Sequence, residues 1–182
     1  MLLKNNNVKT VLKIFFESPT ERFQLRELSR TSGLSTTGVK SALLELLDSK
    51  LIVKTREKKY EFYEANRNDE NYKLYKKFFN VKLLYDSGVL DYLEKELNHP
   101  EAMFLFGSAS KGEDAETSDI DVFVLASVKK EPNLEWYDRK LKRDIKLVIM
   151  TDEDLERAKE KNPELVNNIV NGIGLRGFLE VL

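Results

Sequence analysis

The sequence predicts an α+β protein of two domains, and three observations support this. Apolar residues recur at helical spacing early in the chain, and apolar runs of strand length follow later. The length of 182 residues allows one large domain or two small ones. Charge is uneven: residues 1–80 hold sixteen Lys or Arg and ten Asp or Glu, whereas residues 81–182 hold fourteen and twenty-one. A basic first part indicates a domain with a polyanionic partner, although solvated helix faces explain the same charges.

The composition narrows the class of protein. The absence of cysteine excludes a disulfide framework, a thiolate zinc site and a cysteine nucleophile. The only histidine, His99, precedes Pro100 in a predicted loop, so histidine-based catalysis is not expected. No apolar run approaches the roughly twenty residues that span a bilayer, and the first residues lack a signal-peptide pattern. We therefore expect a cytoplasmic protein that does not engage a membrane.

Three helices and a hairpin are predicted in the first part. The first helix stops at Ser18-Pro19, the second covers Leu25–Arg30 and ends at Gly33, and Ser35 caps the third. Strand-like residues 51–56 and 60–65 then flank a charged turn. The apolar faces of the first and third helices consist of Val8, Val11, Leu12, Phe15 and Phe16, and of Val39, Leu43, Leu44, Leu46 and Leu47.

This order of elements is the layout of a winged helix-turn-helix, and residues 8–66 resemble that family. The resemblance implies that residues 1–66 bind double-stranded DNA, with the third helix in the major groove and the hairpin wing on the backbone. The residues placed for contact are Ser35, Thr36, Thr37, Lys40 and Ser41 on the helix, and Lys54, Arg56, Lys58 and Lys59 on the wing. A winged helix used only for dimerisation or protein contact stays open, because this helix carries no Arg for a bidentate guanine contact.

Residues 67–98 are predicted to connect two domains through helices. The segment 66–71 is polar and rich in turn formers. Apolar residues then run close to helical period up to Leu97, with a break near Ser87-Gly88 that predicts two helices; they are Leu74, Phe78, Val81, Leu84, Leu90 and Leu93. The first of these helices pairs with its copy in a homodimer or packs against its own protomer, and the sequence leaves both open.

Two carboxylates stand beside a Gly-Ser turn in the later part. The apolar run 103–106 ends at Gly107-Ser108, and a second apolar run carries Asp119 and Asp121. Because side chains alternate along a strand, both acids project from one face, where they repel each other. A divalent cation removes this repulsion, so the pair predicts a Mg²⁺ or Mn²⁺ site. If Lys111 lies in a short helix after the turn, the free N–H groups and this ammonium favour a phosphate.

Residues Phe106-Gly107-Ser108, Lys111-Gly112 and Ser118-Asp119-Ile120-Asp121 resemble the core motif of DNA-polymerase-β-like nucleotidyltransferases, in particular the minimal, MNT-type members. The resemblance covers about the last eighty residues, and it implies a nucleotidyltransferase domain at 99–182 with a mixed β-sheet flanked by helices. It also implies that Gly107, Ser108 and Lys111 bind a nucleoside triphosphate such as ATP. Asp119 and Asp121 would bind catalytic metal, and family members usually add a third carboxylate from a later strand.

The third carboxylate departs from the family pattern. In Asp144-Ile145-Lys146-Leu147, the position that matches the family acid holds Lys146, and Asp144 lies two residues earlier on the same face. Either Asp144 is the third catalytic and metal ligand, or Lys146 takes the place of the acid and pairs with one of the other two. Beyond this strand the sequence predicts helices at 134–142 and, capped by Thr151, at 152–161, and a short strand within 171–177.

Two functions follow from these resemblances. One is an enzyme that transfers a nucleoside monophosphate from ATP to an acceptor hydroxyl; the likeness to antitoxin-type members implies a toxin-type protein partner as acceptor. The alternative is a DNA-binding transcriptional regulator whose second domain only binds nucleotide or is inactive.

Overall fold

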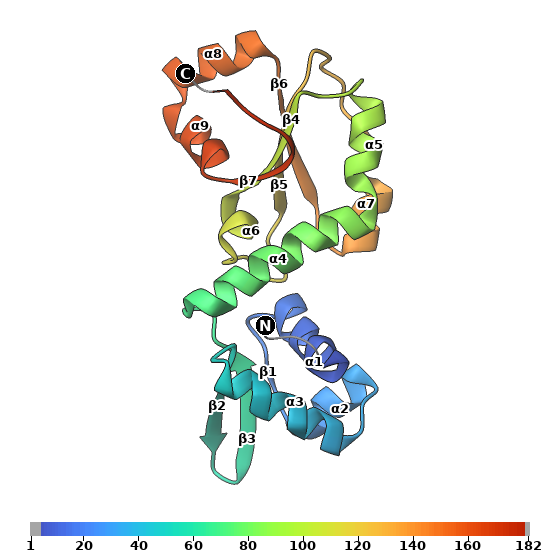
Figure 1. Ribbon diagram of the computed structural model, residues 1–182, viewed down its shortest axis with the longest axis vertical. Coiled ribbons are helices and arrows are strands. Elements are labelled where there is room, and N and C mark those ends of the chain that lie inside the picture. The colour runs from blue at the N-terminus through green and yellow to red at the C-terminus, as the bar shows by residue number, and fades with distance from the viewer. Residues whose placement is uncertain (1–4, 181–182) are drawn as a thin grey trace. The chain divides into compact units, whose positions relative to one another are not determined.

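The computed structural model describes residues 5–180. They form two compact units, divided between Lys76 and Lys77 inside helix α4 (Glu70–Ser87), and each unit is described by itself (Figure 1). No helix within 5–180 combines the length and apolarity needed to cross a membrane.

The first unit contains helices and a small antiparallel sheet. The elements before α4 are α1 (Asn6–Glu17), β1 (Arg22–Phe23), α2 (Leu25–Ser32), α3 (Thr36–Asp48), β2 (Ile52–Glu57) and β3 (Tyr60–Ala65). The strand order is β1-β3-β2. The three predicted helices and the hairpin are confirmed. Strand β1 was not predicted, because two residues give no periodic signal, and it forms through pairing with β3.

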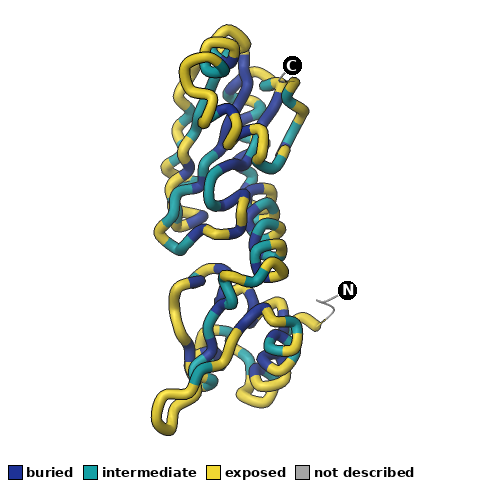
Figure 2. Tube along the Cα trace, turned by 90° about the vertical axis from the view of Figure 1, so that its left-hand side faces the viewer, coloured by how far each residue is buried: buried dark blue, intermediate teal, exposed yellow. Residues whose placement is uncertain are grey.

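The core of the first unit lies between its helices and the sheet. Phe15 of α1 meets Phe23 of β1 edge to face, with ring centroids 5.6 Å apart. The carbonyls that end α1 accept hydrogen bonds from the buried α4 side chains Tyr72, at Phe15 O, and Lys76, at Phe16 O. The prediction that Leu44 belongs to the apolar face of α3 is wrong, since this side chain is 62% exposed. The tip of the β2–β3 hairpin is exposed (Figure 2).

Gly88, with φ +83°, separates α4 from α5 (Val89–Glu96), as the break in the apolar pattern predicts. Leu84, Leu90 and Leu93 are buried. Leu74 and Phe78 were expected on the same apolar side, but the structure leaves them 48% and 64% exposed.

The second unit is built around a mixed four-stranded sheet. Its further elements are β4 (Ala102–Phe106), α6 (Gly107–Lys111), β5 (Ile120–Leu125), α7 (Glu135–Leu141), β6 (Ile145–Met150), α8 (Asp152–Lys161), α9 (Pro163–Val170) and β7 (Ile173–Gly177). The strand order is β6-β5-β4-β7, with β5 and β6 parallel and the other pairs antiparallel. This confirms the predicted mixed sheet flanked by helices, whereas α9 was not predicted.

Side chains alternate across this sheet and build a core on each face. Met103 and Leu105 of β4, with Val122 and Val124 of β5, pack in one cluster with residues of α5 and with Leu141 of α7. The opposite face is covered by α8 and α9 (Figure 1) through a cluster of Ala102, Phe106, Phe123, Leu125, Leu155, Val166 and Ile169. Asp121 and Lys146 have the strand parity of this second face.

Candidate functional site

Gly107 joins strand β4 to helix α6 and lies against one of the predicted acids. Its φ is +68°, a left-handed conformation that glycine adopts without steric cost. A Cβ atom at this position would lie 2.3 Å from Oδ2 of Asp121, so the carboxylate rests directly on the glycine backbone. The strand register agrees, because Phe106 is the Cα partner of Asp121. The structure thus brings together the Gly-Ser turn and Asp121.

Asp119 and Asp121 share their surroundings with a lysine. Asp119 directly precedes β5, and Asp121 pairs in register with Lys146 of the parallel strand β6. Lys146 Nζ forms an ion pair with Oδ2 of Asp119. Of the two arrangements that the sequence left open, the structure contains the one in which Lys146 binds an acid of the pair.

The charges of this cluster shift the proton affinities of its members. Burial raises the pKa of Asp121, the neighbouring Asp119 carboxylate raises it further, and Lys146 and Arg143 oppose these effects in part. The hydrogen bond to Asp119 raises the pKa of Lys146, so the ammonium stays charged at neutral pH. Asp121 is therefore a carboxylate whose charged form gains from an additional cation.

Asp144 directly precedes β6. It is exposed, and its carbonyl accepts the hydrogen bond of Ile120 N at 2.8 Å. A cavity of about 280 Å³ is lined by Glu116, Thr117, Asp119, Asp138, Arg139, Lys142, Arg143 and Asp144. Within residues 5–180, no three His, Cys, Asp or Glu side chains are grouped so that they can hold a metal. Asp119, Asp121 and Asp144 are thus not assembled as a three-carboxylate centre. The β6 residue in register with Asp121 is Lys146, not an acid.

Two carboxylates suit a metal that arrives with a ligand. Mg²⁺ is commonly held by one or two carboxylates and completes its coordination with water and substrate phosphates. Asp119 and Asp121 offer these two carboxylates. The backbone of the Gly107 turn is the group that phosphates would contact. The donor set therefore fits a metal–nucleotide complex once Lys146 releases Asp119, and it does not fit a metal held by protein alone.

The predicted phosphate-binding residues lie on α6. Ser108 is half-buried in the first turn, and Lys111 is exposed at the last residue of the helix. The buried Ser110 is engaged locally, since its hydroxyl donates to Gly107 O at 2.9 Å.

Sequence reasoning missed a buried polar network behind the acids. Asn80 of α4, Asp114 of the loop after α6, and Arg143 before β6 are joined by hydrogen bonds. They are far apart in the sequence, and each alone looks like an ordinary polar residue. Only the fold reveals them as a group.

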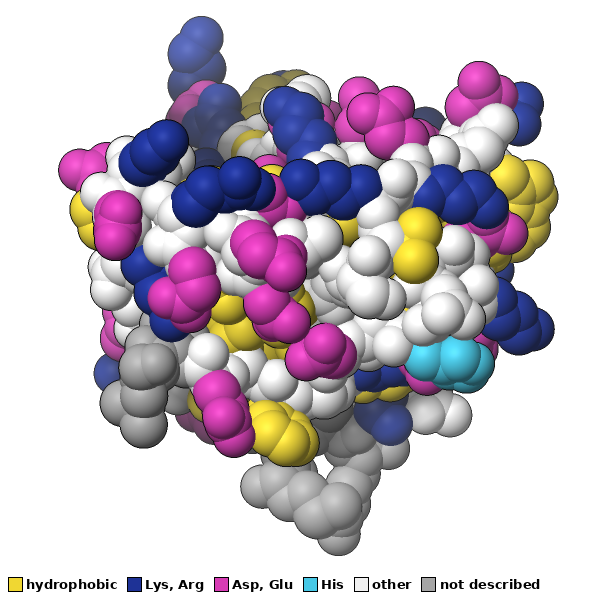
Figure 3. All heavy atoms as spheres, turned by 90° about the horizontal axis from the view of Figure 1, so that it is seen from above, with side chains coloured by type: hydrophobic (Ala, Val, Ile, Leu, Met, Phe, Trp, Pro, Cys, Tyr) yellow, Lys and Arg dark blue, Asp and Glu magenta, His cyan; other side chains and the backbone are white. Residues whose placement is uncertain are grey.

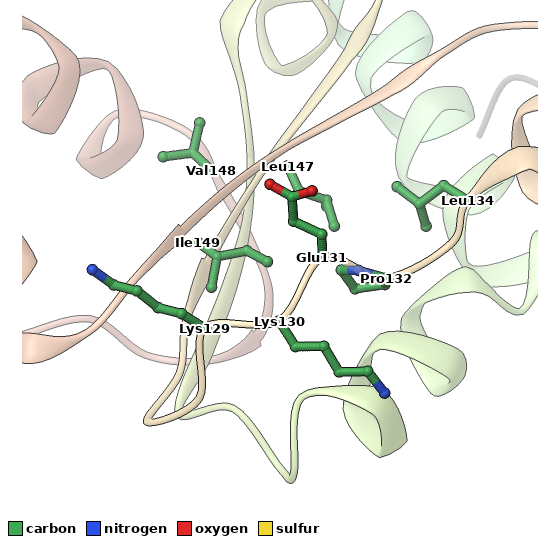
Figure 4. A pocket seen from close by; sticks show the side chains of 8 residues that line it. All are labelled: Lys129, Lys130, Glu131, Pro132, Leu134, Leu147, Val148 and Ile149. Atoms are coloured by element: carbon green, nitrogen blue, oxygen red, sulfur yellow. The ribbon is translucent and has the colours of Figure 1, made fainter.

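A second cavity of the unit lies away from the acids. It measures about 630 Å³ and lies between the 129–132 segment and the edge of β6 (Figure 4); its lining is Lys129, Lys130, Glu131, Pro132, Leu134, Leu147, Val148 and Ile149. No predicted site residue lines it, and Lys129 and Lys130 form ion pairs with Asp154 and Glu96. Basic and acidic side chains intermingle on the face of this unit seen in Figure 3.

The residues predicted to contact DNA are exposed in the first unit. Ser35 caps α3 by accepting the Gly38 N–H at 3.1 Å, and Thr36, Thr37, Lys40 and Ser41 are exposed on the first turns. On the hairpin, Lys54 forms an ion pair with Glu61, and Arg56 donates to Lys58 O at 3.3 Å. Lys58 and Lys59 are exposed at the turn. A cavity of about 590 Å³ near Thr36 is lined by two cations that were not predicted, Arg26 and Arg30 of α2.

Comparison with known proteins finds one family similarity, which lies within the second unit. No curated protein and no solved structure matches the chain. Residues 87–175, just under half of the chain, match the family described as polymerase beta, nucleotidyltransferase. The match begins at the α4–α5 junction, includes Gly107, Asp119 and Asp121, and ends in β7. Over residues 87–175 this chain is therefore similar to the polymerase beta nucleotidyltransferase family.

Proposed function

We propose that this protein transfers a nucleoside monophosphate from ATP to an acceptor hydroxyl and that its first unit binds DNA. One observation carries the enzymatic part: the carboxylate of Asp121 lies against Gly107, at the start of α6. The proposed metal ligand Asp121 thus lies next to the proposed phosphate-binding turn, within the segment that matches the family. The match of residues 87–175 supports this assignment.

Each residue has a distinct part in the proposed transfer. The backbone of Gly107 and the N–H and hydroxyl of Ser108 bind the triphosphate, and Lys111 adds positive charge. Asp119 and Asp121 would hold Mg²⁺, which would lower the phosphate charge and align the groups. The acceptor oxygen forms a bond to the α-phosphorus as the bond to the β-phosphate oxygen breaks; the hydroxyl proton passes to water, and pyrophosphate leaves. Catalysis of this kind is mostly positioning and electrostatics.

The transfer is tested with α-labelled ATP, Mg²⁺ and candidate acceptors. We expect label transfer by the native protein and its loss in Asp121→Asn, which keeps the shape of the side chain and removes its charge. Asp86→Asn, an exposed acid of the same unit that pairs with Lys82, serves as the matched control and should transfer label normally. Equal transfer by the native protein and Asp121→Asn would overturn the proposal.

The acceptor hydroxyl is proposed to belong to a toxin-type protein, because the domain resembles antitoxin-type minimal nucleotidyltransferases. Co-expression with the product of the adjacent gene, followed by intact-mass measurement of that product, tests this. A mass increase of one nucleoside monophosphate supports the proposal, and an unchanged mass with an active enzyme contradicts it.

A second candidate function is a DNA-binding regulator whose second unit binds nucleotide without turnover. The ion pair between Lys146 and Asp119 favours it, because this contact occupies an acid that a metal requires. Calorimetric titration with ATP and Mg²⁺, run beside the transfer assay, separates the two functions. Binding without label transfer to any acceptor selects the regulator.

DNA binding is proposed from the layout of the first unit. The order α1, β1, α2, α3 and a β2–β3 hairpin resembles a winged helix-turn-helix, and the start of α3 presents only small polar side chains and Lys40. Arg26 and Arg30 beside Thr36 add cations near that helix start. Anisotropy titration with duplexes from the protein's own promoter region tests this. The proposal predicts binding that weakens with salt, and the absence of binding at low salt would contradict it.

A further inference from the structure

A buried charge pair, Asp114 and Arg143, lies next to the backbone of the acid pair. Asp114 has a fully buried side chain, and that of Arg143 is 9% exposed. Arg143 Nη1 donates to Asp114 Oδ2 at 2.8 Å. Breaking such a pair is costly, yet apolar residues of similar volume often serve stability as well. Stability alone therefore does not explain why this domain contains the Arg143–Asp114 pair.

Arg143 uses its remaining donors to hold the backbone that leads into β5. Its Nε donates to Ser118 O at 2.6 Å and its Nη2 to Asp119 O at 3.1 Å. One guanidinium thus holds a buried carboxylate and two consecutive carbonyls. Only arginine presents donors in such a fixed planar fork, and the ammonium of lysine cannot reproduce it. The backbone of Asp119 is therefore fixed in place by Arg143.

Asp114 connects the same network to helix α6, which carries the proposed phosphate-binding residues. Its Oδ1 accepts from Asn80 Nδ2 at 2.7 Å, and the same amide group donates to Ala109 O in α6 at 2.9 Å. The loop is also tied to the turn directly, because Glu113 N donates to Ser108 O at 3.0 Å. A continuous chain of hydrogen bonds thus runs from α6, through Asn80, Asp114 and Arg143, to Asp119.

We propose that Asn80, Asp114 and Arg143 are positioning residues that set the spacing between the α6 turn and the Asp119–Asp121 pair. The inference rests on the proposed function of that site. The two halves must bind one metal–nucleotide complex at the same time, and small displacements of metal ligands are costly. Partners that orient metal ligands commonly change metal affinity by about 10- to 100-fold when they are removed.

The test measures binding of the preformed complex of Mn²⁺ with α,β-methylene-ATP to the full-length protein, by isothermal titration calorimetry. Arg143→Lys keeps the charge and removes the fork, and we expect it to lower the affinity by about tenfold or more. Arg157→Lys, an exposed arginine of α8, is the matched control and should bind like the native protein. All measurements are made well below the melting temperature of each variant.

Stability and positioning are separated by this design. If Arg143 serves only stability, Arg143→Lys melts at a lower temperature while its folded form binds with native affinity, and the inference is overturned. Asn80→Ala gives a second measurement that leaves the Arg143–Asp114 pair intact, and it should weaken binding in the same direction. Where Arg143→Lys does not fold, native affinity in Asn80→Ala overturns the inference.

The same experiment distinguishes failure of the inference from failure of the proposed function. Asp121→Asn should abolish binding of the Mn²⁺–nucleotide complex. Loss in Asp121→Asn with native binding in Arg143→Lys and Asn80→Ala overturns the positioning role alone. Absence of binding by the native protein overturns the proposed function and, with it, this inference.

Discussion

Gly107 combines two constraints that no other residue type satisfies. Its backbone is left-handed, and the Asp121 carboxylate occupies the space of a Cβ atom. The sequence predicts a Gly-Ser turn at this glycine, but it does not predict that its nearest neighbour is an acid of the pair. That contact depends on the register between β4 and β5, which strand patterns alone do not determine.

Gly107→Ala should therefore lose both stability and nucleotide binding. The left-handed conformation alone costs about 1–2 kcal/mol for a residue with a Cβ atom, and displacement of Asp121 adds to this. Urea unfolding and Mn²⁺–nucleotide binding are the measurements. Gly174→Ala is the control, because its Cβ would lie 3.7 Å from the Phe104 ring, at ordinary contact distance. Equal unfolding free energies for the two variants would contradict the expectation.

Asp121 should make stability depend on pH. The pKa of Asp121 is raised in the folded state, so in this pH range the folded protein binds more protons than the unfolded chain. The free energy of unfolding therefore falls as pH rises from the ordinary carboxyl pKa to the raised one. Asp121→Asn removes this loss, so its melting temperature should exceed the native one at about pH 8, with the difference shrinking near pH 4. Melting curves without metal at both pH values check this. A constant difference would show that the charge is not the cause.

Lys146 should compete with a metal for Asp119. Replacement by Gln removes the ion pair and a nearby positive charge, so the affinity for the Mn²⁺–nucleotide complex should rise about two- to fivefold. Lys82→Gln, an exposed lysine of the same unit, controls for the change in net charge. Equal affinities for this complex in both variants would exclude the competition. The sequence could identify Lys146 as a departure from the family pattern, whereas its choice of partner required the structure.

At the level of elements, capping and periodicity predict most helices and strands, and their failures have local causes. Helix α9 was missed because it follows α8 with only Asn162 between them, so the two apolar patterns run together. Leu44 and Phe78 have apolar helical spacing but are exposed, because the spacing does not reveal which face of a helix packs against other elements. The network of Asn80, Asp114 and Arg143 could not be predicted, because it joins residues from α4, a loop and the turn before β6.

The start of α3 allows capping to be separated from DNA contact. Ser35→Ala should lower the free energy of unfolding by about 1 kcal/mol, because the Gly38 N–H loses its acceptor. Ser35→Asp keeps an effective cap and should retain stability, while its charge repels phosphate and weakens DNA binding. Thermal melts and anisotropy titrations of both variants check this. If Ser35→Asp binds DNA like the native protein, the start of α3 does not face DNA.

For the whole molecule, the charge imbalance between the two parts of the sequence gives a quantitative prediction. Lys58 and Lys59 are exposed at the hairpin turn, where the wing would reach the DNA backbone. Replacing either one with Ala should reduce the slope of log affinity against log salt by about 1, since each releases one counterion fewer. Lys82→Ala in the second unit should leave the slope unchanged. An unchanged slope in all three variants would remove the wing from the DNA interface.

The position of β6 at one end of the strand order has a consequence for solubility that is independent of chemistry. A terminal strand has backbone donors and acceptors without a neighbour on one side, which can recruit strands of other molecules. Lys146 lies on this strand with most of its side chain in solvent, and a charged lysine on an outer strand disfavours such recruitment. We therefore expect the lysine that departs from the family acid to oppose aggregation as well, so that apolar replacements of Lys146 precipitate on concentration.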